Sequence, residues 1–269
     1  MLINSKNLNK DFCPLCQSKN ISFDRPYGKI NFLSCTSIYK CKKCELNFAH
    51  ELPSKEDLNK YYSSGLYYDR VGNPQSSQIL DFSLKLSITR VQLIKKFVKQ
   101  NFDVLKAIDV GAGSAIFGLA LKKYYNNVIY DTIEPDSQVQ KNISNWINHQ
   151  YLDIIDVNEN DYELVIMNQV LEHVPDPIDF LNSLRNLLKN DGYIYIDVPY
   201  KDFLFKPSIE PHLLFWNEKS LKTLLNKVGF ELIFYSTAGM PHPIAKNFFY
   251  PQTFFQKIQN FWLYAAKIN

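Results

Sequence analysis

An alternation of short apolar strands and amphipathic helices begins near residue 106 and restricts the fold of this chain more than any other feature. A strand is expected at 107–110, and a glycine loop and a helix to about residue 125 follow it. This order predicts an α/β fold with an open, Rossmann-like, mostly parallel sheet and helices on both faces. Further strands are expected at 128–134, 150–155, 162–167, 193–198 and 230–235, and further helices at 137–147, from Pro177 to just before Gly192, and at 218–228.

Composition divides the chain into four parts. Residues 1–50 hold all five cysteines and lack the long apolar runs that build a core. The spacing of apolar residues within 51–105 predicts a helical linker that leads into a long amphipathic helix. The main domain is assigned to 106–240, and an aromatic C-terminal extension to 241–269. Apolar residues between 258 and 263 follow helical spacing, so we expect the extension to pack on the domain or to form a homodimer interface, because its few lysines do not suit a membrane-surface helix.

A glycine loop follows the first strand of the main domain. Residues 109–118 read Asp-Val-Gly-Ala-Gly-Ser-Ala-Ile-Phe-Gly, and glycines at this place let the backbone approach a ligand closely. The bulky Ile116 disfavours a dinucleotide fingerprint, and no Lys-Ser/Thr pair makes a phosphate-binding P-loop. Glu134 ends the next strand, where a carboxylate accepts hydrogen bonds from a ribose diol. Together these residues predict a nucleoside ligand.

Five segments in this order resemble the motifs of the class I S-adenosylmethionine-dependent methyltransferases. The resemblance covers about 106–236, and one departure is Ala115, where many members have a third glycine. Residues 109–113 are similar to their first motif and 133–136 to the acidic end of their second strand. The fourth and fifth strands and the late helix are matched by 162–177, 192–199 and 215–230.

The resemblance implies a binding site for S-adenosylmethionine. Gly111 and Gly113 would lie along its methionine part, with Asp109 fixing the loop and Glu134 holding the ribose hydroxyls. The candidates for the remaining cofactor contacts, adenine above all, are Asp153, Asp156 and Asn168. The alternative is a sheet without catalytic activity that serves as a nucleoside-binding module.

The cysteines form two C-x2-C pairs, Cys13 with Cys16 and Cys41 with Cys44. Two such turns can supply the four thiolates of a tetrahedral zinc site, which leaves no open position for catalysis, so the expected zinc is structural. Cys35 is a spare that could replace one ligand, and two metal-free thiol turns are the alternative. An odd, clustered set of cysteines without an export signal points to a reduced, cytoplasmic protein.

Two histidines are candidates for the base that deprotonates the methyl acceptor. His173 follows the fourth strand, and His212 follows the fifth. Each has a structural alternative, because His173 could anchor its loop and His212 could pack under a cluster of aromatic residues, Phe203, Phe205, Phe215 and Trp216.

A cysteine ribbon followed by a tyrosine-rich connector resembles methyltransferases of sugar and surface-polysaccharide pathways. That likeness implies a small-molecule substrate, a nucleotide sugar or glycan. The chain ends before the further C-terminal domain of the sugar C-methyltransferases, so a hydroxyl or amine acceptor is favoured. The connector's tyrosines, which could stack on a sugar or simply pack between domains, are Tyr61, Tyr62, Tyr67 and Tyr68.

Charge weighs against nucleic acid as a partner. The net charge is +3, and the first 60 residues carry ten Lys or Arg against six Asp or Glu. The rest of the chain is balanced, so an RNA methyltransferase that grips RNA with its ribbon is kept as the second hypothesis. No stretch approaches the roughly 20 apolar residues that a transmembrane helix needs.

Overall fold

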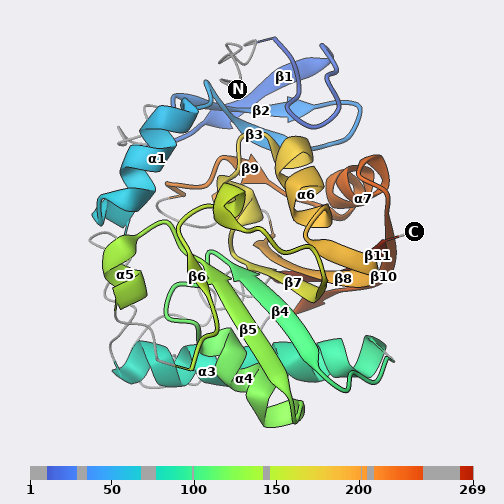
Figure 1. The fold of residues 1–269 in the computed structure, drawn as a ribbon. Coiled ribbons are helices and arrows are strands. Elements are labelled where there is room, and N and C mark those ends of the chain that lie inside the picture. The colour runs from blue at the N-terminus through green and yellow to red at the C-terminus, as the bar shows by residue number, and fades with distance from the viewer. Residues whose placement is uncertain are drawn as a thin grey trace, which may run out of the picture.

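A computed structural model describes residues 11–28, 35–67, 77–98, 100–141, 146–200, 202–204, 209–238 and 261–268. Its main element is a seven-stranded sheet in the order β10-β11-β8-β7-β4-β5-β6 (Figure 1). Neighbouring strands from β8 to β6 run parallel, whereas β11 is antiparallel to both β8 and β10. The predicted α/β class and mostly parallel sheet are confirmed. The strands are β4 (Leu105–Val110), β5 (Val128–Ile133), β6 (Gln150–Tyr151), β7 (Tyr162–Asn168), β8 (Leu188–Pro199), β10 (Phe230–Ala238) and β11 (Phe261–Ile268).

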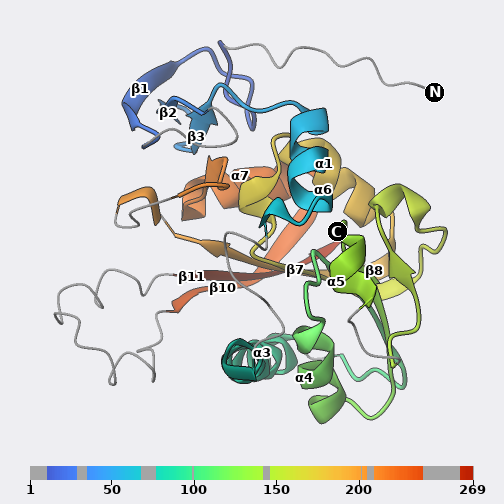
Figure 2. The ribbon, with the colours of Figure 1, turned by 90° about the vertical axis from the view of Figure 1, so that its left-hand side faces the viewer.

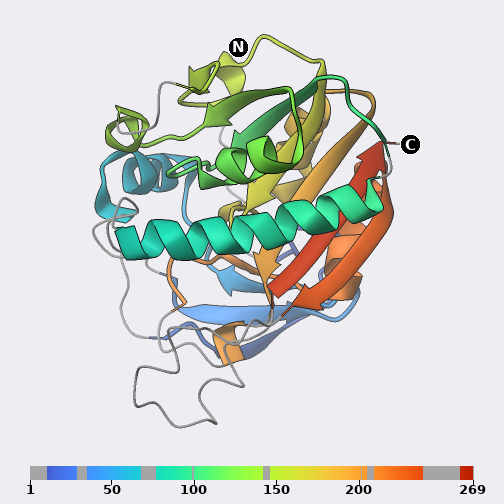
Figure 3. The same cartoon turned by 90° about the horizontal axis from the view of Figure 1, so that it is seen from below.

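Helices cover both faces of this sheet. On one face lie α3 (Ser77–Phe97) and α4 (Ile116–Tyr124), and Figure 3 shows α3 crossing the strands. On the other face lie α6 (Pro177–Arg185) and α7 (Glu218–Lys227), and α1 (Lys55–Ser63) lies on the same side of the sheet (Figure 2). The short α5 (Ser137–Lys141) follows β5. The described residues also contain three 3₁₀ turns: η1 (Ile154–Asp156), η2 (Leu171–His173) and η3 (Asp202–Leu204).

Three helices, α1, α6 and α7, begin where side chains can satisfy their first backbone N–H groups. Ser54 accepts a hydrogen bond from the amide of Asp57 at the start of α1. Asp176 caps α6 in the same way, with Pro177 at its first position. Asn217 and Ser220 form a reciprocal capping box at the start of α7. These three caps follow the general preference for Ser, Asp and Asn at the N-terminal end of a helix.

The cysteine-rich region is a ribbon built on a second, four-stranded antiparallel sheet. Its strands are β1 (Ile21–Pro26), β2 (Ser37–Cys41), β3 (Asn47–His50) and β9 (Leu214–Phe215), in that order. The last of these comes from the late part of the chain, so the ribbon and the main domain share a sheet. Figure 2 shows the ribbon seated above the layer of α1, α6 and α7.

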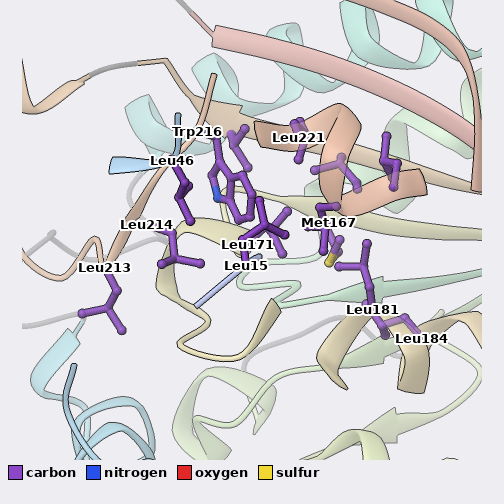
Figure 4. Packing of buried hydrophobic residues seen from close by; sticks show 14 of the residues in the cluster. Leu15, Leu46, Met167, Leu171, Leu181, Leu184, Leu213, Leu214, Trp216 and Leu221 are labelled. Atoms are coloured by element: carbon purple, nitrogen blue, oxygen red, sulfur yellow. The ribbon is translucent and has the colours of Figure 1, made fainter. Parts of the chain in front are cut away.

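A continuous apolar core joins the ribbon to the main sheet. Leu15 and Leu46 from the ribbon pack in the same cluster as Leu171 and Trp216 (Figure 4). All four side chains are fully buried. Burying a large apolar side chain contributes roughly 1.5–3 kcal/mol, so this contact is a substantial part of what holds the ribbon in place. A second cluster lies between the sheet and the helices α3 and α4.

The second half of the sheet departs from expectation in two places. The helix that was expected to reach Gly192 ends at Arg185, and Leu188 already belongs to β8. Gly192 is needed inside the strand, because a Cβ there would lie 2.9 Å from the backbone oxygen of Lys189. The expected strand at 150–155 stops after Tyr151, since Asp153 caps η1 instead.

The other two differences concern predicted helices. The helix expected at 137–147 is described only over Ser137–Lys141, and residues 146–148 are not helical. The prediction of a helix around residues 261–263 is wrong, because these residues belong to β11, which lies between β10 and β8 in the sheet. Their backbone groups are paired on both sides, which a buried strand requires. The end of the C-terminal extension thus joins the main sheet, and residues 241–260, part of the expected dimer interface, fall outside the described residues.

Candidate active site

The glycine loop leaves the carboxyl end of β4 in a left-handed conformation. Gly111 has φ +66° and Gly113 has φ +53°, and the amide of Gly111 donates to the carbonyl of Ile133 over 2.8 Å. A Cβ at Gly111 would lie 2.6 Å from Cγ2 of Val170, so only glycine fits this close approach. Ala115 also has a positive φ of 56°, and it begins α4 without a third glycine.

Glu134 lies beside this loop, as the sequence predicted. Its carboxylate accepts hydrogen bonds from the amides of Gly113 over 2.9 Å and Asp136 over 3.1 Å. The side chain is almost fully buried, with 4% of its surface exposed. A carboxylate has about four acceptor positions, so it is a group that can accept from both hydroxyls of a ribose.

Asp109 supports the loop from inside the protein. It is buried and accepts a hydrogen bond from the hydroxyl of Tyr130, and burial raises its pKa to about 7. The Tyr130 ring in turn packs closely on Gly118 of α4. The contacts of Asp109 thus lie within the protein, which fits the expected role of fixing the loop.

The remaining cofactor candidates lie at the ends of β6 and β7. Asp153 and Asp156 are exposed, and each accepts a hydrogen bond from the backbone of η1. The exposed Ile155 lies between them. Asn168 ends β7, and its Oδ1 atom is shielded from solvent without a partner among the described residues. A buried acceptor of this kind suits a ligand that brings a donor.

The two predicted histidines lie together. The rings of His173 and His212 are 4.9 Å apart, centroid to centroid, in an edge-to-face arrangement. His173 lies on η2 after β7, and its Nδ1 atom is 3.4 Å from the carbonyl oxygen of Pro211. Both rings are largely buried, with side-chain exposures of 11% and 13%.

Asp202 completes a carboxylate–imidazole pair that sequence reasoning missed. Its Oδ2 atom lies 2.6 Å from Nδ1 of His212, and only 1% of Asp202 is exposed. Because a carboxylate accepts, the proton belongs on the nitrogen that faces it, which leaves Nε2 of a neutral His212 as an acceptor. The available signal was an aspartate ten residues before a candidate histidine, and that spacing alone does not predict a contact.

Glu172 is a second acidic residue that the sequence analysis did not single out. It is 1% exposed, and its Oε1 atom lies 3.7 Å from Nε2 of His173. One ligand atom each of Glu172, His173 and His212 lie within 4.8 Å of one another. This set of donors could also accommodate a divalent cation.

Tyrosines from the connector form one wall of this cluster. Tyr62 and Tyr67 lie edge-on to His173 with centroid distances of 5.8 and 6.1 Å, and both also pack against Tyr61. Burial raises the pKa of Tyr62 well above its usual value, so its hydroxyl remains a donor. That hydroxyl has no partner among the described residues. Tyr68 lies outside them.

The same connector also reaches the cofactor loop. Burial raises the pKa of Tyr67, and the charges of Glu172 and Glu134 raise it further. A Cβ added to Gly65 would lie 4.0 Å from Oδ2 of Asp136. The tyrosine segment therefore extends between the histidine pair and the loop that carries Glu134.

The four predicted metal ligands are gathered in the ribbon. Cys13 and Cys44 have sulfur atoms 3.5 Å apart, as do Cys16 and Cys41, and all four sulfurs lie within 4.8 Å of one another. Sulfurs that share a tetrahedral zinc ion at about 2.3 Å are about 3.8 Å apart, so the residues fit this metal. Cys35 is not in the cluster, and burial raises the pKa of its thiol to about 12.

Comparisons with known proteins agree with this geometry. A family model described as a methyltransferase domain matches residues 86–234. A ubiquinone biosynthesis O-methyltransferase of Hydrogenovibrio crunogenus is 24% identical over 168 residues, which cover 56% of this chain and 69% of that protein. The enzyme of the same name from Actinobacillus pleuropneumoniae is 31% identical over 102 residues, 34% of this chain and 44% of its own length.

Solved structures share the fold. Magnesium protoporphyrin IX methyltransferase from Synechocystis, solved with bound S-adenosylmethionine, superposes with a TM-score of 0.52 at 14% identity, covering 78% of this chain and 94% of that one. An S-adenosylmethionine-dependent methyltransferase from Leishmania major gives 0.53 at 15% identity and covers 78% of this chain and 80% of its own. Among the described residues, no helix has the length and apolar character needed to cross a bilayer.

Proposed function

Since the chain belongs to the methyltransferase-domain family and is an S-adenosylmethionine-dependent methyltransferase, we propose that it methylates a hydroxyl group of a small ring-shaped molecule, with His212 as the base. The observation that carries this proposal is the pair formed by His212 and Asp202, 2.6 Å apart, in contact with His173. A hydroxyl is a poor nucleophile until its proton is removed, and a neutral imidazole oriented by a carboxylate is suited to that task.

The cofactor half of the reaction uses the loop after β4. S-adenosylmethionine supplies a methyl group on a positively charged sulfur, which is already activated for transfer. We assign its ribose hydroxyls to Glu134 and its methionine part to the backbone at Gly111 and Gly113. The partnerless Oδ1 of Asn168 supports a further contact to a cofactor donor. Asp109 would hold the loop through Tyr130, and Asp153 and Asp156 remain the candidates near adenine.

The acceptor half orients the hydroxyl and takes its proton. Neutral His212 would receive that proton on Nε2, while Asp202 stabilises the imidazolium that forms. His173 is assigned a supporting role beside it, held at Pro211 and near Glu172. The buried hydroxyl of Tyr62 is a donor suited to a second oxygen of the acceptor. Since the donor is activated, holding the acceptor in line with the methyl group is the other main contribution.

Two acceptor classes fit an aromatic wall. A sugar ring stacks on tyrosines through its C–H groups, which supports the nucleotide sugar or glycan expected from the ribbon and connector. A phenol also stacks there, and both named curated relatives are O-methyltransferases of ubiquinone biosynthesis. An amine is the less suited acceptor. A neutral amine needs no base before it attacks, so the paired His212 and Asp202 would have no role in that step.

The ribbon is assigned a structural zinc ion bound by its four clustered cysteines. A closed site of this kind stabilises a small sheet that has little core of its own. RNA methylation remains the second hypothesis, and its test is whether binding to RNA weakens steeply with salt. Any measured turnover would exclude the hypothesis of a non-catalytic nucleoside-binding module. A cytoplasmic location stays a prediction.

A methyl-transfer assay tests the proposed function. Zinc-replete protein is incubated with radiolabelled S-adenosylmethionine and a panel that contains catechols, nucleotide sugars and short RNAs. We expect transfer to at least one ring hydroxyl and none to RNA. Tyr62→Phe should raise KM for that acceptor without changing affinity for S-adenosylhomocysteine, because it removes only one donor.

The matched control is Tyr39→Phe, which changes a ribbon tyrosine that stacks on His50. Methylation of RNA alone would replace the proposal with the second hypothesis. Methylation of an amine with a rate that does not depend on His212 would overturn the assignment of the base.

A further inference from the structure

The segment that carries His212 takes its main-chain support from the ribbon. Its strand, β9, adds to the ribbon sheet beside β3, with Asn47 opposite Phe215 and Phe48 opposite Leu214. Next to this pairing, the amide of Ala49 donates to the carbonyl of Leu213 over 2.7 Å. Main-chain hydrogen bonds therefore connect the acceptor side of the active site to the cysteine-rich region.

This support continues directly into η2, the turn that holds His173. The amide of Leu213 donates to the carbonyl of Glu172 over 2.7 Å. One residue of the late segment thus accepts from the ribbon and donates to η2. Around it, Leu46 and Trp216 pack in one core with Leu214 (Figure 4). Two hydrogen bonds and buried apolar packing thus join the ribbon to the segments that carry both histidines.

Tyr27, which follows β1, adds a bond to His212 itself. Its hydroxyl donates to the main-chain oxygen of His212 over 2.8 Å, across 185 positions of sequence. The ring is 4% exposed, and its own amide donates to the carbonyl of Thr36 over 3.1 Å. Burial raises the pKa of Tyr27 well above its usual value, so the hydroxyl keeps the proton that it donates.

The position of this bond matters because His212 needs a defined main chain. The amide of His212 donates to the carbonyl of Ile209 over 2.8 Å, and Nδ1 of its ring faces Asp202. With both backbone groups held, the imidazole can reach Asp202 through its side-chain torsions alone. A positioned base requires its geometry to be held within about half an ångström.

We infer that Tyr27 is a positioning residue, whose hydroxyl fixes the main chain at His212 and thereby holds the imidazole against Asp202. The reaction that this serves rests on the proposed function. The positioning itself concerns only contacts within the chain, so it can be tested without an acceptor. By this inference the ribbon is part of the acceptor site, although none of its cysteines takes part in the chemistry.

The test compares Tyr27→Phe with the full-length wild-type protein, both loaded with zinc. The variant keeps the buried ring and loses one oxygen, and a thermal melt checks that it is folded. Imidazole nitrogen spectra report which ring nitrogen of His212 carries the proton, and hydrogen exchange by mass spectrometry reports on 209–217. Tyr39→Phe is the negative control, and Asp202→Asn supplies the spectrum of a His212 without its carboxylate.

We expect wild-type His212 to be protonated at Nδ1, and Tyr27→Phe to show a mixture of the two tautomers. Exchange over 209–217 should become at least five-fold faster, while the affinity for S-adenosylhomocysteine stays within two-fold. Unchanged tautomers in a folded Tyr27→Phe protein would overturn the inference, as would equal effects of Tyr39→Phe. Should neither protein bind S-adenosylhomocysteine, the proposed function fails, and the His212 spectra still decide the positioning role.

Discussion

The centre of the proposed cofactor side comes from two adjacent parallel strands, whereas the proposed acceptor side comes from four separate segments. Gly113 and Glu134 follow β4 and β5, and a hydrogen bond of 2.9 Å joins them. On the acceptor side, His173, Asp202, His212 and Tyr27 come from η2, η3, the chain before β9 and the ribbon. The first half is therefore set mainly by the sheet, and the second depends on how the ribbon sits on it.

This difference predicts how the two halves respond to damage. Changes in the ribbon or near His212 should reduce methyl transfer and spare cofactor binding. Changes in the glycine loop should reduce cofactor binding first. Four variants follow, from the largest expected effect to the smallest. The first and last test the supports of the two halves, and the second and third test the division itself.

Cys41→Ser should have the largest effect. Loss of one of four thiolates removes most of the metal affinity, and structural zinc contributes to folding directly. We expect less than one zinc per chain by elemental analysis and a Tm lower by more than about 5 °C, which corresponds to roughly 2 kcal/mol in a chain of this size. Cys35→Ser is the control and should keep one zinc per chain. Full zinc in Cys41→Ser, or zinc loss in Cys35→Ser, would contradict the four-cysteine site.

His212→Gln should lower kcat by roughly 10²–10⁴-fold, which is the usual contribution of a positioned base. Its affinity for S-adenosylhomocysteine should stay within two-fold. His149→Gln is a matched control, because His149 is half exposed and lies at the start of β6. A loss of less than ten-fold in steady-state kinetics would move the base to another residue, with His173 the next to test.

Gly111→Ala should weaken cofactor binding, because its Cβ would lie 2.6 Å from Val170 and its φ of +66° disfavours any side chain. Left-handed backbone costs an alanine roughly 1–2 kcal/mol before the clash is counted. Gly28→Ala is the control, since Gly28 also has a positive φ, +127°, but open space around it. Calorimetry should show weaker binding in Gly111→Ala alone; equal affinity in both variants would exclude the close approach as the cause.

Asp109→Asn should have the smallest effect, on the pH dependence of stability. Burial raises the pKa of Asp109 in the folded chain to about 7, from the ordinary value of about 4 in the unfolded chain. Its protonated form therefore contributes stability that is complete below pH ~4 and is lost as the pH rises to about 7. Between pH 5 and 8 the wild-type Tm should fall more than that of Asp109→Asn. The exposed control Asp81→Asn should follow the wild type; identical slopes in all three proteins would contradict the raised pKa.

The sequence predicted the places of the glycine loop and of Glu134 in the sheet well, for a physical reason. The strand at Asp109, the glycines after it and Glu134 are local features, and parallel strands place their carboxyl ends at one edge. The cluster of four cysteines was also predicted, because one metal ion needs those thiolates close together.

The acceptor side was predicted only in part. His173 and His212 were named singly, and their contact could not be predicted, because 39 positions separate them and the ribbon decides how the second approaches. Asp202 and Tyr27 lie in none of the matched motifs, and Glu172, although it lies within the matched segment 162–177, was not singled out. The strand β11 was missed for a similar reason, since its aromatic residues suit helix or strand and its two neighbours in the sheet decide between them.

A calorimetric titration of S-adenosylhomocysteine into three zinc-replete proteins tests the division of the site most directly. The proteins are the wild type, Glu134→Ala and His212→Gln. We predict that Glu134→Ala binds roughly 10–100-fold more weakly, because charged hydrogen bonds are worth about 1.5–3 kcal/mol, and that His212→Gln binds within two-fold of the wild type. Equal loss in both variants, or wild-type affinity in Glu134→Ala, would contradict a cofactor side that is built and bound independently of the acceptor side.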